Sequence, residues 1–423
     1  MVLFSRSTAF SRVTTLAAQR QIHAAFAWMH NNPRTIMDWQ AKLVAIPAPP
    51  FGEAARAKWI AECFVKAGLS EVETDTAGNV LGLVPAKHLP AESSGPVVVL
   101  SAHLDTVFPA ETQLSPKVSE TDGYLRLEAP GASDNAAGVA GMLALVHAII
   151  VAEIELAVPL LVIANVGEEG EGDLRGIRHF YNESVLASRV AAHVVLDGAG
   201  ADSAVTQALG SLRFQVNISG PGGHSFTDAG TPNPIAALAS ALAVIGETQL
   251  PDEPRTTLNI GTIHGGTSVN SIPERAAASI DFRSTSSDEL MRLEVALHRA
   301  VEDAVNRANG IAAMLRGRSR GPLTFTITKI GVRPAASLSP DSPMLETLRS
   351  VDRHLGIRTD LRLGSTDANI PISRGIPALS MGAGGDGGGA HTMAEWYCDK
   401  NRELGLRRAL LLTLAIAEWA AEQ

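Results

Sequence analysis

The sequence predicts an α/β fold, in which a mostly parallel, helix-covered sheet carries an inserted α+β domain. The first reason is a set of uninterrupted apolar runs, such as PVVVL, PLLVIANV and AAHVVLD, which are typical of parallel strands buried on both faces. The second is that helical stretches separate these runs. The third is that the strands near the middle of the chain alternate apolar and polar residues instead. At 423 residues the chain exceeds what one core usually serves, so two domains are expected.

The first domain in this prediction comprises residues 38–208 and 331–423, because helix-like and strand-like segments alternate in both stretches. Its expected helices cover roughly residues 52–68, 135–150, 174–187, 342–355 and 402–421. Its expected strands lie near residues 79–84, 96–101, 159–166, 192–197 and 377–381.

The second domain in this prediction covers residues 209–330. The segment SLRFQVNISG is an alternating strand, and a helix near 233–248 follows it. Two further strands, TTLNIGTIHGG and RAAASIDFRS, precede a long helix that is expected to end at Gly310, and LTFTITKI forms the last strand. This order of strand, helix, strand, strand, helix and strand is the split βαβ arrangement.

The N-terminal extension, residues 1–37, contains arginine, serine and threonine but no acidic residue before Asp38. That composition fits an organellar targeting segment. We favour the alternative, an ordinary amphipathic helix, because four large apolar residues fall on roughly one face. These are Leu16, Ile22, Phe26 and Met29.

Composition excludes several classes of partner. The formal net charge is −9 and aromatic residues make up 4% of the chain, so a basic, stacking surface for nucleic acid is not expected. No apolar window has the length of a membrane span. The two cysteines, Cys63 and Cys398, are expected to be reduced thiols, which favours the cytoplasm.

Acidic and histidine side chains recur at the ends of the apolar runs or in the turns that follow them. Ligands of open α/β sheets bind at the carboxyl ends of the strands, so these side chains are expected to converge there. They are His103, Asp105, Asp134, Glu168, Glu169, Asp197 and His391. Several carboxylates with two imidazoles suit a pair of divalent metal ions, and the pattern therefore predicts a metal-dependent hydrolase.

The adjacent glutamates of GEEG are the most informative of these residues. They directly follow PLLVIANV, where desolvation penalises a charge that nothing compensates. One carboxylate could bind a metal while its neighbour takes a proton from water. A solvated acidic turn is the alternative, and Asp134 followed by Asn135 also fits simple helix capping.

Seven stretches together carry a resemblance to a known family. In chain order they are SAHLDTV, GASDNAAGVAG, GEEGEGDLRG, VVLDG, GPGGHS, TSVNSIPERAAASIDFR and GGGAHTMAEW. Residues 40–420 resemble the dinuclear zinc exopeptidases and deacylases, which include peptidase T, glutamate carboxypeptidase, aminoacylase, acetylornithine deacetylase and succinyl-diaminopimelate desuccinylase. IPAPPFGE and GSTDANIP look most similar to the peptidase T-like branch.

The resemblance implies roles for the residues of the catalytic domain. His103 and Asp197 would bind one metal, Glu169 and His391 would bind the other, and Asp134 would bridge the two. The ions would be zinc, although cobalt or manganese also suit such ligands. Asp105 would support His103, and Glu168 would be the general base that activates the water between the metals.

The resemblance also implies that the inserted domain is a lid and a dimerisation domain. His224 would reach into an active site, often that of the partner subunit, and stabilise the oxyanion there. Asn270 and Arg283 would grip a substrate carboxylate. Taken alone, His224 would be a histidine in a turn and Arg283 would be a charged residue on the surface of a strand.

The implied protein is a cytoplasmic, homodimeric, two-zinc aminopeptidase or tripeptidase that acts on short peptides. In the family, aspartate at the position of Asp197 tends to accompany that activity. The alternative is an N-acyl amino acid deacylase that uses the same site. A non-catalytic metal-binding relative would lack the base or one of the ligands that this sequence contains. A purely structural protein, whose acids cap helices, would bind no metal.

Overall fold

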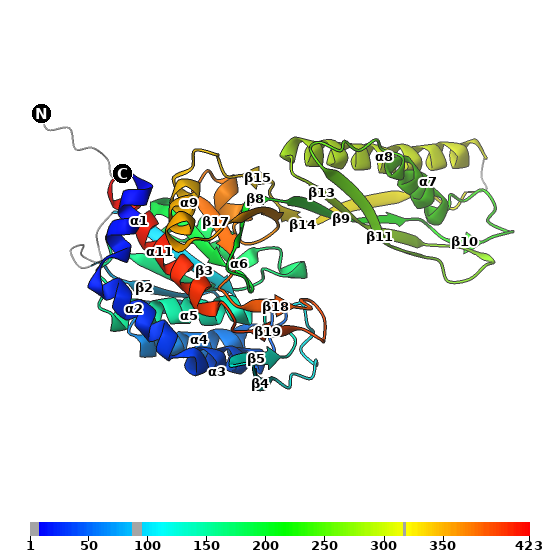
Figure 1. Cartoon of the computed structure of the whole chain (residues 1–423). Helices are drawn as coiled ribbons and strands as arrows, with labels where there is room; N and C mark the ends of the chain where they lie inside the picture. Colours follow the sequence, from blue (N-terminus) through cyan, green and yellow to red (C-terminus); the bar gives the residue numbers. More distant parts are fainter. Residues whose placement is uncertain (1–7, 87–94, 316–318) are drawn as a thin grey trace, which may run out of the picture. The chain divides into compact units, whose positions relative to one another are not determined.

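The computed structural model describes residues 8–86, 95–315 and 319–423, and it divides the chain into two compact units (Figure 1). The first unit is formed by residues 1–208 and 337–423, and the second by residues 209–336. The first has a central sheet with parallel inner strands and flanking helices, and the second is an α+β unit inserted into it. This architecture confirms the predicted fold class.

The central sheet of the first unit runs in the order β1-β2-β6-β3-β7-β17-β8-β15, and β16 pairs with β8. The four inner strands β6, β3, β7 and β17 are mutually parallel, and β2 joins β6 antiparallel. The strands are β1 (Ser70–Thr74), β2 (Val80–Val84), β3 (Val97–His103), β6 (Leu160–Asn165), β7 (Val190–Leu196), β8 (Ser203–Ala208), β15 (Ala336–Ser337), β16 (Asp360–Gly364) and β17 (Ala378–Met381).

The apolar runs are buried because helices cover both faces of this sheet. Every residue of β3 and of β6 is buried. On one face, Val98, Leu100 and Ala102 join a core that includes α5 and α11, and on the other, Val97 and Val99 pack with α6. The helices of the unit are α1 (Ala9–Ala17), α2 (Arg20–Asn31), α3 (Pro33–Val44), α4 (Ala54–Ala67), α5 (Ala136–Val151), α6 (Arg175–Glu183), α9 (Pro343–Leu355), α10 (Asn369–Ser373) and α11 (Arg402–Ala421).

The N-terminal extension differs from the single amphipathic helix that we expected. Two helices, α1 and α2, replace it, because the backbone is extended at Gln19, which precedes α2. The apolar residues of the predicted face are nevertheless in the core, since Leu16, Ile22 and Met29 are buried. These helices pack on α5, α9 and α11, and Arg12 forms an ion pair with Glu422 at 3.2 Å.

A small antiparallel sheet in the first unit was not predicted. Its strand order is β18-β19-β5-β4. Its strands are short and all five residues of β4 are exposed, so β4 lacks the apolar pattern that identifies a strand in a sequence. Only five residues long, β5 alternates two buried leucines with more exposed residues. They are β4 (Lys117–Thr121), β5 (Tyr124–Glu128), β18 (Asp386–Gly388) and β19 (Trp396–Cys398).

The second unit contains an antiparallel sheet in the order β11-β13-β9-β14, and α7 and α8 lie together on one face of it (Figure 1). The long helix does not end at Gly310 as predicted but continues to Met314, because a glycine inside a helix costs only about 1 kcal/mol and Ala312 is buried. The elements are β9 (Gly210–Ser219), β10 (Gly223–His224), α7 (Pro234–Gly246), β11 (Thr256–Gly265), β12 (Ser271–Ile272), β13 (Arg275–Ser284), α8 (Ser287–Met314) and β14 (Thr324–Arg333).

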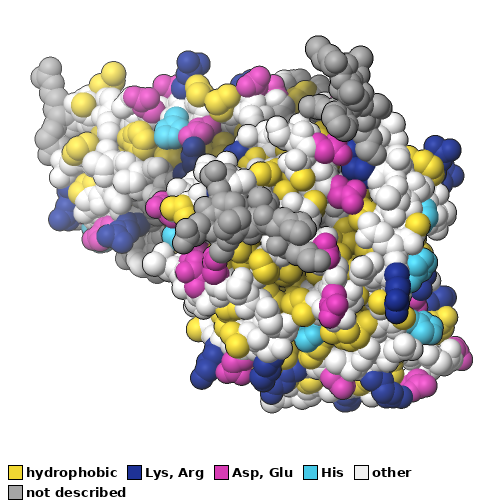
Figure 2. Space-filling model, turned by 90° about the vertical axis from the view of Figure 1, so that its left-hand side faces the viewer, with side chains coloured by type: hydrophobic (Ala, Val, Ile, Leu, Met, Phe, Trp, Pro, Cys, Tyr) yellow, Lys and Arg dark blue, Asp and Glu magenta, His cyan; other side chains and the backbone are white. Residues whose placement is uncertain are grey.

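The mixture of charges on the surface and the character of the described helices agree with what the composition predicts. On the face drawn in Figure 2, acidic and basic side chains are interspersed among hydrophobic and uncoloured atoms. Among the described residues, none of the helices combines the length and the apolar character that a membrane crossing requires. Cys63 and Cys398 are free thiols.

Candidate metal centre and active site

The parallel inner strands of the central sheet bring the predicted site residues to one edge. His103 is the last residue of β3, and Asp197 directly follows the last residue of β7. Glu168 and Glu169 come three and four residues after the end of β6. Because β6, β3 and β7 run parallel, these residues share the carboxyl-terminal edge.

Asn135 fixes the loop that carries Asp134. Its side-chain oxygen accepts the N–H of Gly138 at 3.0 Å and so caps α5, as the sequence had suggested. The same side chain accepts the N–H of Gly198 at 2.9 Å and donates to the carbonyl of Leu196 at 2.9 Å. A Cβ at Gly138 would lie 2.5 Å from that Leu196 carbonyl oxygen, so only glycine allows the helix to start this close to β7. The loop with Asp134 is thereby held against the loop with Asp197.

The carboxylate of Asp134 lies between the two imidazoles. His103 Nε2 is 3.1 Å from Asp134 Oδ1 and 3.7 Å from Asp197 Oδ1. His391 Nε2 is 3.0 Å from Asp134 Oδ2 and 3.0 Å from Glu169 Oε1. All five residues predicted as metal ligands therefore meet in one site, with Asp134 at its centre.

Asp105 has a broader role than support of His103 alone. The His103 Nδ1 atom bonds to the main-chain oxygen of Asp105 at 3.1 Å, and it lies 3.6 Å from the Asp105 carboxylate. The carboxylate oxygens accept the main-chain N–H groups of Glu168 and Glu169 at 2.9 and 2.8 Å. Asp105 is fully buried, so it connects the end of β3 rigidly to the turn that holds both glutamates.

The acid and base pKa values in the site are displaced from their ordinary values. Burial opposes protonation of His103, but hydrogen bonds to Asp105, Asp134 and Asp197 more than offset it and raise its pKa well above the usual value. Burial and the charge of Asp134 raise the pKa of Glu169 to about 7. The hydrogen bond to Asp134 raises the pKa of His391 to about 9. Proton binding by His103, Glu169 and His391 therefore depends on the charge of Asp134.

These residues fit a divalent metal pair. Ligand atoms of His103, Asp134 and Glu169 all lie within 4.8 Å of one another. Asp134 Oδ1 is buried, and His103 Nε2 lies 3.1 Å from it at a geometry that falls short of a well-formed hydrogen bond. An imidazole and carboxylate oxygens at this spacing are a donor set that zinc accepts. A dication would supply a counter-charge to these carboxylates.

Three predicted site residues belong to the second unit. His224 and Asn270 lie close together there, because His224 pairs with Ser271 in the β10–β12 ladder and the N–H of Ser225 donates to the Asn270 carbonyl at 3.0 Å. The Nδ1 atom of His224 accepts the N–H of Phe226 at 3.1 Å, so a neutral ring carries its proton on Nε2.

Arg283 is separated from that pair. It lies near the end of β13, eight residues beyond Arg275, which is roughly 27 Å along a strand. Its guanidinium bonds to Asp281 at 2.7 Å. The resemblance had suggested that Asn270 and Arg283 grip one substrate carboxylate. Within the unit, the structure does not bring these two residues together.

Glu395 and Asp367 are buried acids of the first unit to which the sequence analysis gave no role. The Glu395 carboxylate accepts three main-chain N–H groups of the Asp134 loop. Asp367 accepts the side-chain N–H of Asn165, the last residue of β6, at 2.7 Å. Burial raises the pKa of Asp367 to about 7. Both acids lie in stretches that carried the resemblance, AHTMAEW and GSTDANIP. Their place in these stretches was the signal from which a role could have been predicted.

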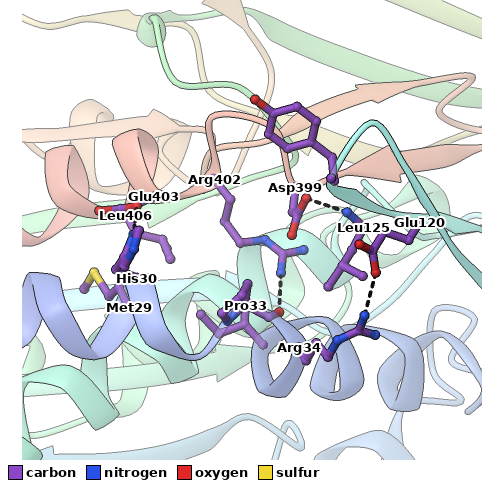
Figure 3. Close-up of a pocket in the computed structure, with 13 residues that line it drawn as sticks. Met29, His30, Pro33, Arg34, Glu120, Leu125, Asp399, Arg402, Glu403 and Leu406 are labelled. Atoms are coloured by element: carbon purple, nitrogen blue, oxygen red, sulfur yellow. Dashed lines mark hydrogen bonds and ion pairs between the residues drawn. The ribbon is translucent and has the colours of Figure 1, made fainter.

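A separate pocket of about 300 Å³ in the first unit does not include the predicted ligands (Figure 3). It lies among α2, α3, α11 and the β4–β5 hairpin. An ion pair links Arg34 to Glu120 at 2.5 Å, and His30 forms a hydrogen bond with Glu403 at 3.0 Å (Figure 3). Arg402 donates to the carbonyl of Pro33 at 3.4 Å (Figure 3). Its charged groups are already paired with one another, which is typical of structural contacts.

Known proteins resemble this chain over much of its length. A probable carboxypeptidase of Aspergillus flavus is 28% identical over 244 residues, which cover 54% of this chain and 56% of that protein. A probable carboxypeptidase of Aspergillus clavatus is 27% identical over 294 residues, covering 65% of this chain and 63% of that protein. The chain thus aligns with a little more than half the length of these curated relatives.

Solved structures share the fold. Aminopeptidase PepT of Bacillus cereus superimposes with a TM-score of 0.68 at 21% identity, covering 93% of this chain and 99% of that one. A tripeptidase of Staphylococcus aureus gives 0.67 at 22% identity, with the same coverages of 93% and 99%. Human carnosine dipeptidase 1 gives 0.61 at 16% identity, covering 95% and 100%. The model of Peptidase family M20/M25/M40 matches residues 99–414, which include the five predicted metal ligands, and the chain therefore belongs to this family.

Proposed function

We propose that this protein is a two-metal peptidase that releases the N-terminal residue of short peptides. The observation that carries the proposal is the Asp134 carboxylate, which lies 3.1 Å from His103 on one side and 3.0 Å from His391 on the other. A carboxylate between two imidazoles, with Asp197 and Glu169 beside them, is the arrangement that a bridged metal pair requires.

His103 and Asp197 would hold one ion, His391 and Glu169 the other, and Asp134 would share its two oxygens between them. Zinc is the ion that we propose. When bound, such a pair polarises the scissile carbonyl and lowers the pKa of water. The main-chain oxygen of Asp105 holds the Nδ1 side of His103, which directs Nε2 to the ion.

Glu168 would act as the general base. Its main chain is fixed by the Asp105 carboxylate, and it neighbours the ligand Glu169 in sequence. Its carboxylate would take a proton from the attacking water and return it to the leaving amine. Since only 5% of the residue is exposed, little solvent competes for that proton.

The inserted unit would complete the site in a homodimer. The Nε2–H of His224 would donate to the oxyanion of the substrate, and Asn270, which lies next to it, would grip a substrate carboxylate. Because Arg283 is far along β13 from this pair, we propose that the two groups serve different ends of a substrate or different copies of the site. We place the protein in the cytoplasm, in line with its free cysteines.

A second candidate is cleavage from the carboxyl end of the substrate. The name of the Aspergillus relatives, probable carboxypeptidase, favours it. The solved structures with the same fold, an aminopeptidase and a tripeptidase, favour the first proposal. We favour the aminopeptidase because aspartate at the position of Asp197 tends to accompany that activity in the family.

The test is hydrolysis of a matched panel on zinc-loaded and chelator-treated protein. The panel contains a tripeptide with both ends free, the same peptide N-acetylated, the same peptide amidated at its carboxyl end, and N-acetyl amino acids. We expect zinc-dependent release of the first residue from the free and amidated peptides. Cleavage that requires a free carboxyl end would support the second candidate, and activity on N-acetyl amino acids alone would indicate a deacylase.

A further inference from the structure

Glu395 is a buried acid whose carboxylate is used entirely within the protein. The residue is 1% exposed and lies four positions after His391. Its Oε1 atom accepts the main-chain N–H groups of Ser133 and Asp134, both at 2.8 Å, and its Oε2 atom accepts that of Gly131 at 2.7 Å. The three hydrogen bonds partly offset the cost of burying this carboxylate, although burial still raises its pKa above the ordinary value.

We infer that Glu395 is a positioning residue that sets the distance between the bridging ligand Asp134 and the ligand His391. The inference rests on the proposed metal centre, because it assigns to Glu395 the geometry of that same site. The three side-chain hydrogen bonds of Glu395 all go to the main chain of the Asp134 loop, so Glu395 would act through that loop.

The main chain of Glu395 anchors the same loop a second time. Its carbonyl accepts the N–H of Ala129 at 3.1 Å, and the next residue, Trp396, pairs with Glu128 where β19 runs along β5. Side chain and main chain together therefore hold residues 129–134, which lead from β5 to Asp134 and the start of α5. The segment cannot move toward or away from β19 without breaking these bonds.

The His391 side of the site depends on the same anchor. His391 has a left-handed backbone with φ of 64°, a conformation that a non-glycine residue keeps only where its surroundings impose it. Only three residues separate it from Glu395. The segment that carries Asp134 and the segment that carries His391 are therefore both connected to Glu395. In this way Glu395 sets the 3.0 Å distance between His391 Nε2 and Asp134 Oδ2.

An uncharged replacement cannot reproduce this arrangement. In Glu395→Gln, the amide oxygen can still accept from Ser133 and Asp134, but the NH2 group then faces the N–H of Gly131. In Glu395→Ala, all three N–H groups lose their acceptor, which leaves buried donors without a partner. The effect of the two variants should therefore be graded.

Asp399 provides a matched control. It directly follows β19, and its carboxylate accepts the main-chain N–H of Leu125 at 2.8 Å (Figure 3). It therefore also ties β19 to β5, but at the other end of this strand pair. Asp399→Asn makes the same carboxylate-to-amide change as Glu395→Gln at a comparable contact of the same small sheet. Its amide oxygen can still accept from Leu125, and the Asp134 loop is not touched.

The experiment uses the full chain with three readouts. Hydrogen exchange of metal-free protein, followed on peptides that cover residues 129–135, measures the loop directly. Zinc affinity is measured against a competing chelator, and peptide turnover is measured last. We expect Glu395→Ala to accelerate exchange in this segment and to weaken binding of at least one zinc by about 10–100-fold, as loss of a group that orients ligands commonly does. Glu395→Gln should fall between it and the wild type, and Asp399→Asn should match the wild type in zinc affinity.

The outcomes separate this inference from the proposed function. Wild-type exchange and zinc affinity in both Glu395 variants would overturn the inference, and so would an equal loss of zinc in Asp399→Asn. If the wild-type protein binds no zinc, the proposed function fails, while the exchange of residues 129–135 still decides whether Glu395 holds the loop. Should Glu395→Ala fail to fold, the comparison of Glu395→Gln with Asp399→Asn carries the test.

Discussion

The carboxylate of Asp105 accepts the main-chain N–H of Glu168 at 2.9 Å, so the residue two positions after a proposed metal ligand also fixes the backbone of the proposed base. Its other oxygen holds the N–H of Glu169 at 2.8 Å. One buried acid therefore sets the position of the β3 end relative to the turn after β6. The metal site and the proton-transfer group are coupled through it.

Replacing Asp105 by asparagine should disturb both parts of the site. An amide offers one acceptor where the carboxylate offers two, so one of the two N–H groups of Glu168 and Glu169 would face a donor. We expect zinc affinity and kcat to fall together by about 10–100-fold. Zinc titration and peptide turnover on the same preparation measure this. Unchanged zinc affinity would show that the hydrogen bonds to this turn do not position Glu169.

Glu168→Gln should keep the metals and lose turnover. The amide preserves the size of the side chain but cannot accept the proton, so kcat should fall by about 10²–10⁴-fold. The neighbouring substitution Glu169→Gln is the matched control, because it removes a proposed ligand and should lower metal content first. Metal content by elemental analysis and kcat on a tripeptide distinguish the two variants. Wild-type turnover in Glu168→Gln would rule out its role as base.

His224→Ala should lower turnover while metal content stays at the wild-type level, because the lost Nε2–H group would stabilise the oxyanion and bind no ion. His264→Ala, an exposed histidine on β11 of the same unit, is the control and should have no effect. Mixing His224→Ala with Glu168→Gln protein tests the dimer. Recovery of activity in the mixture would mean that His224 acts across subunits, and no recovery would mean that it acts within its own chain or outside the site.

His193 should make the protein less stable in acid. It is buried between Tyr181 and Ser101, with ring contacts of 3.0 and 2.8 Å, and burial lowers its pKa to about 3 from the ordinary 6.5. Below pH 6.5 the unfolded chain binds a proton that the folded chain excludes. The stability contributed by this group is therefore present above 6.5 and is lost as the pH falls, at up to about 1.4 kcal/mol per pH unit.

The measurement is urea unfolding of metal-free wild-type and His193→Gln protein between pH 7 and pH 4. The variant should be less stable at pH 7, because its contacts to Tyr181 and Ser101 are lost, but its free energy of unfolding should fall less steeply with decreasing pH. Comparing slopes cancels the titration of the metal ligands, which both proteins share. Parallel curves would show that His193 takes up its proton without unfolding.

Some elements of this fold could be predicted from the sequence and others could not. The apolar runs of β3, β6 and β7 predicted strands that are buried on both faces, and the order of elements predicted the inserted α+β unit. The exposed strand β4 and the short β18 and β19 could not be predicted, because their pairing depends on partners distant in the chain and leaves no apolar pattern. The prediction that the long helix ends at Gly310 was wrong, because burial of Ala312 outweighs the weak helix propensity of one glycine.

The sequence by itself determined which chemistry is available. Acids and histidines at the ends of apolar runs indicated the ligands, because parallel strands end at one edge and ligand type follows from residue type. Only the tertiary structure decided how those groups are held. That Glu395 holds the loop of Asp134 and that Asp105 holds the turn of Glu168 are relations between residues remote in sequence. Their distances arise only when the packed chain fixes them.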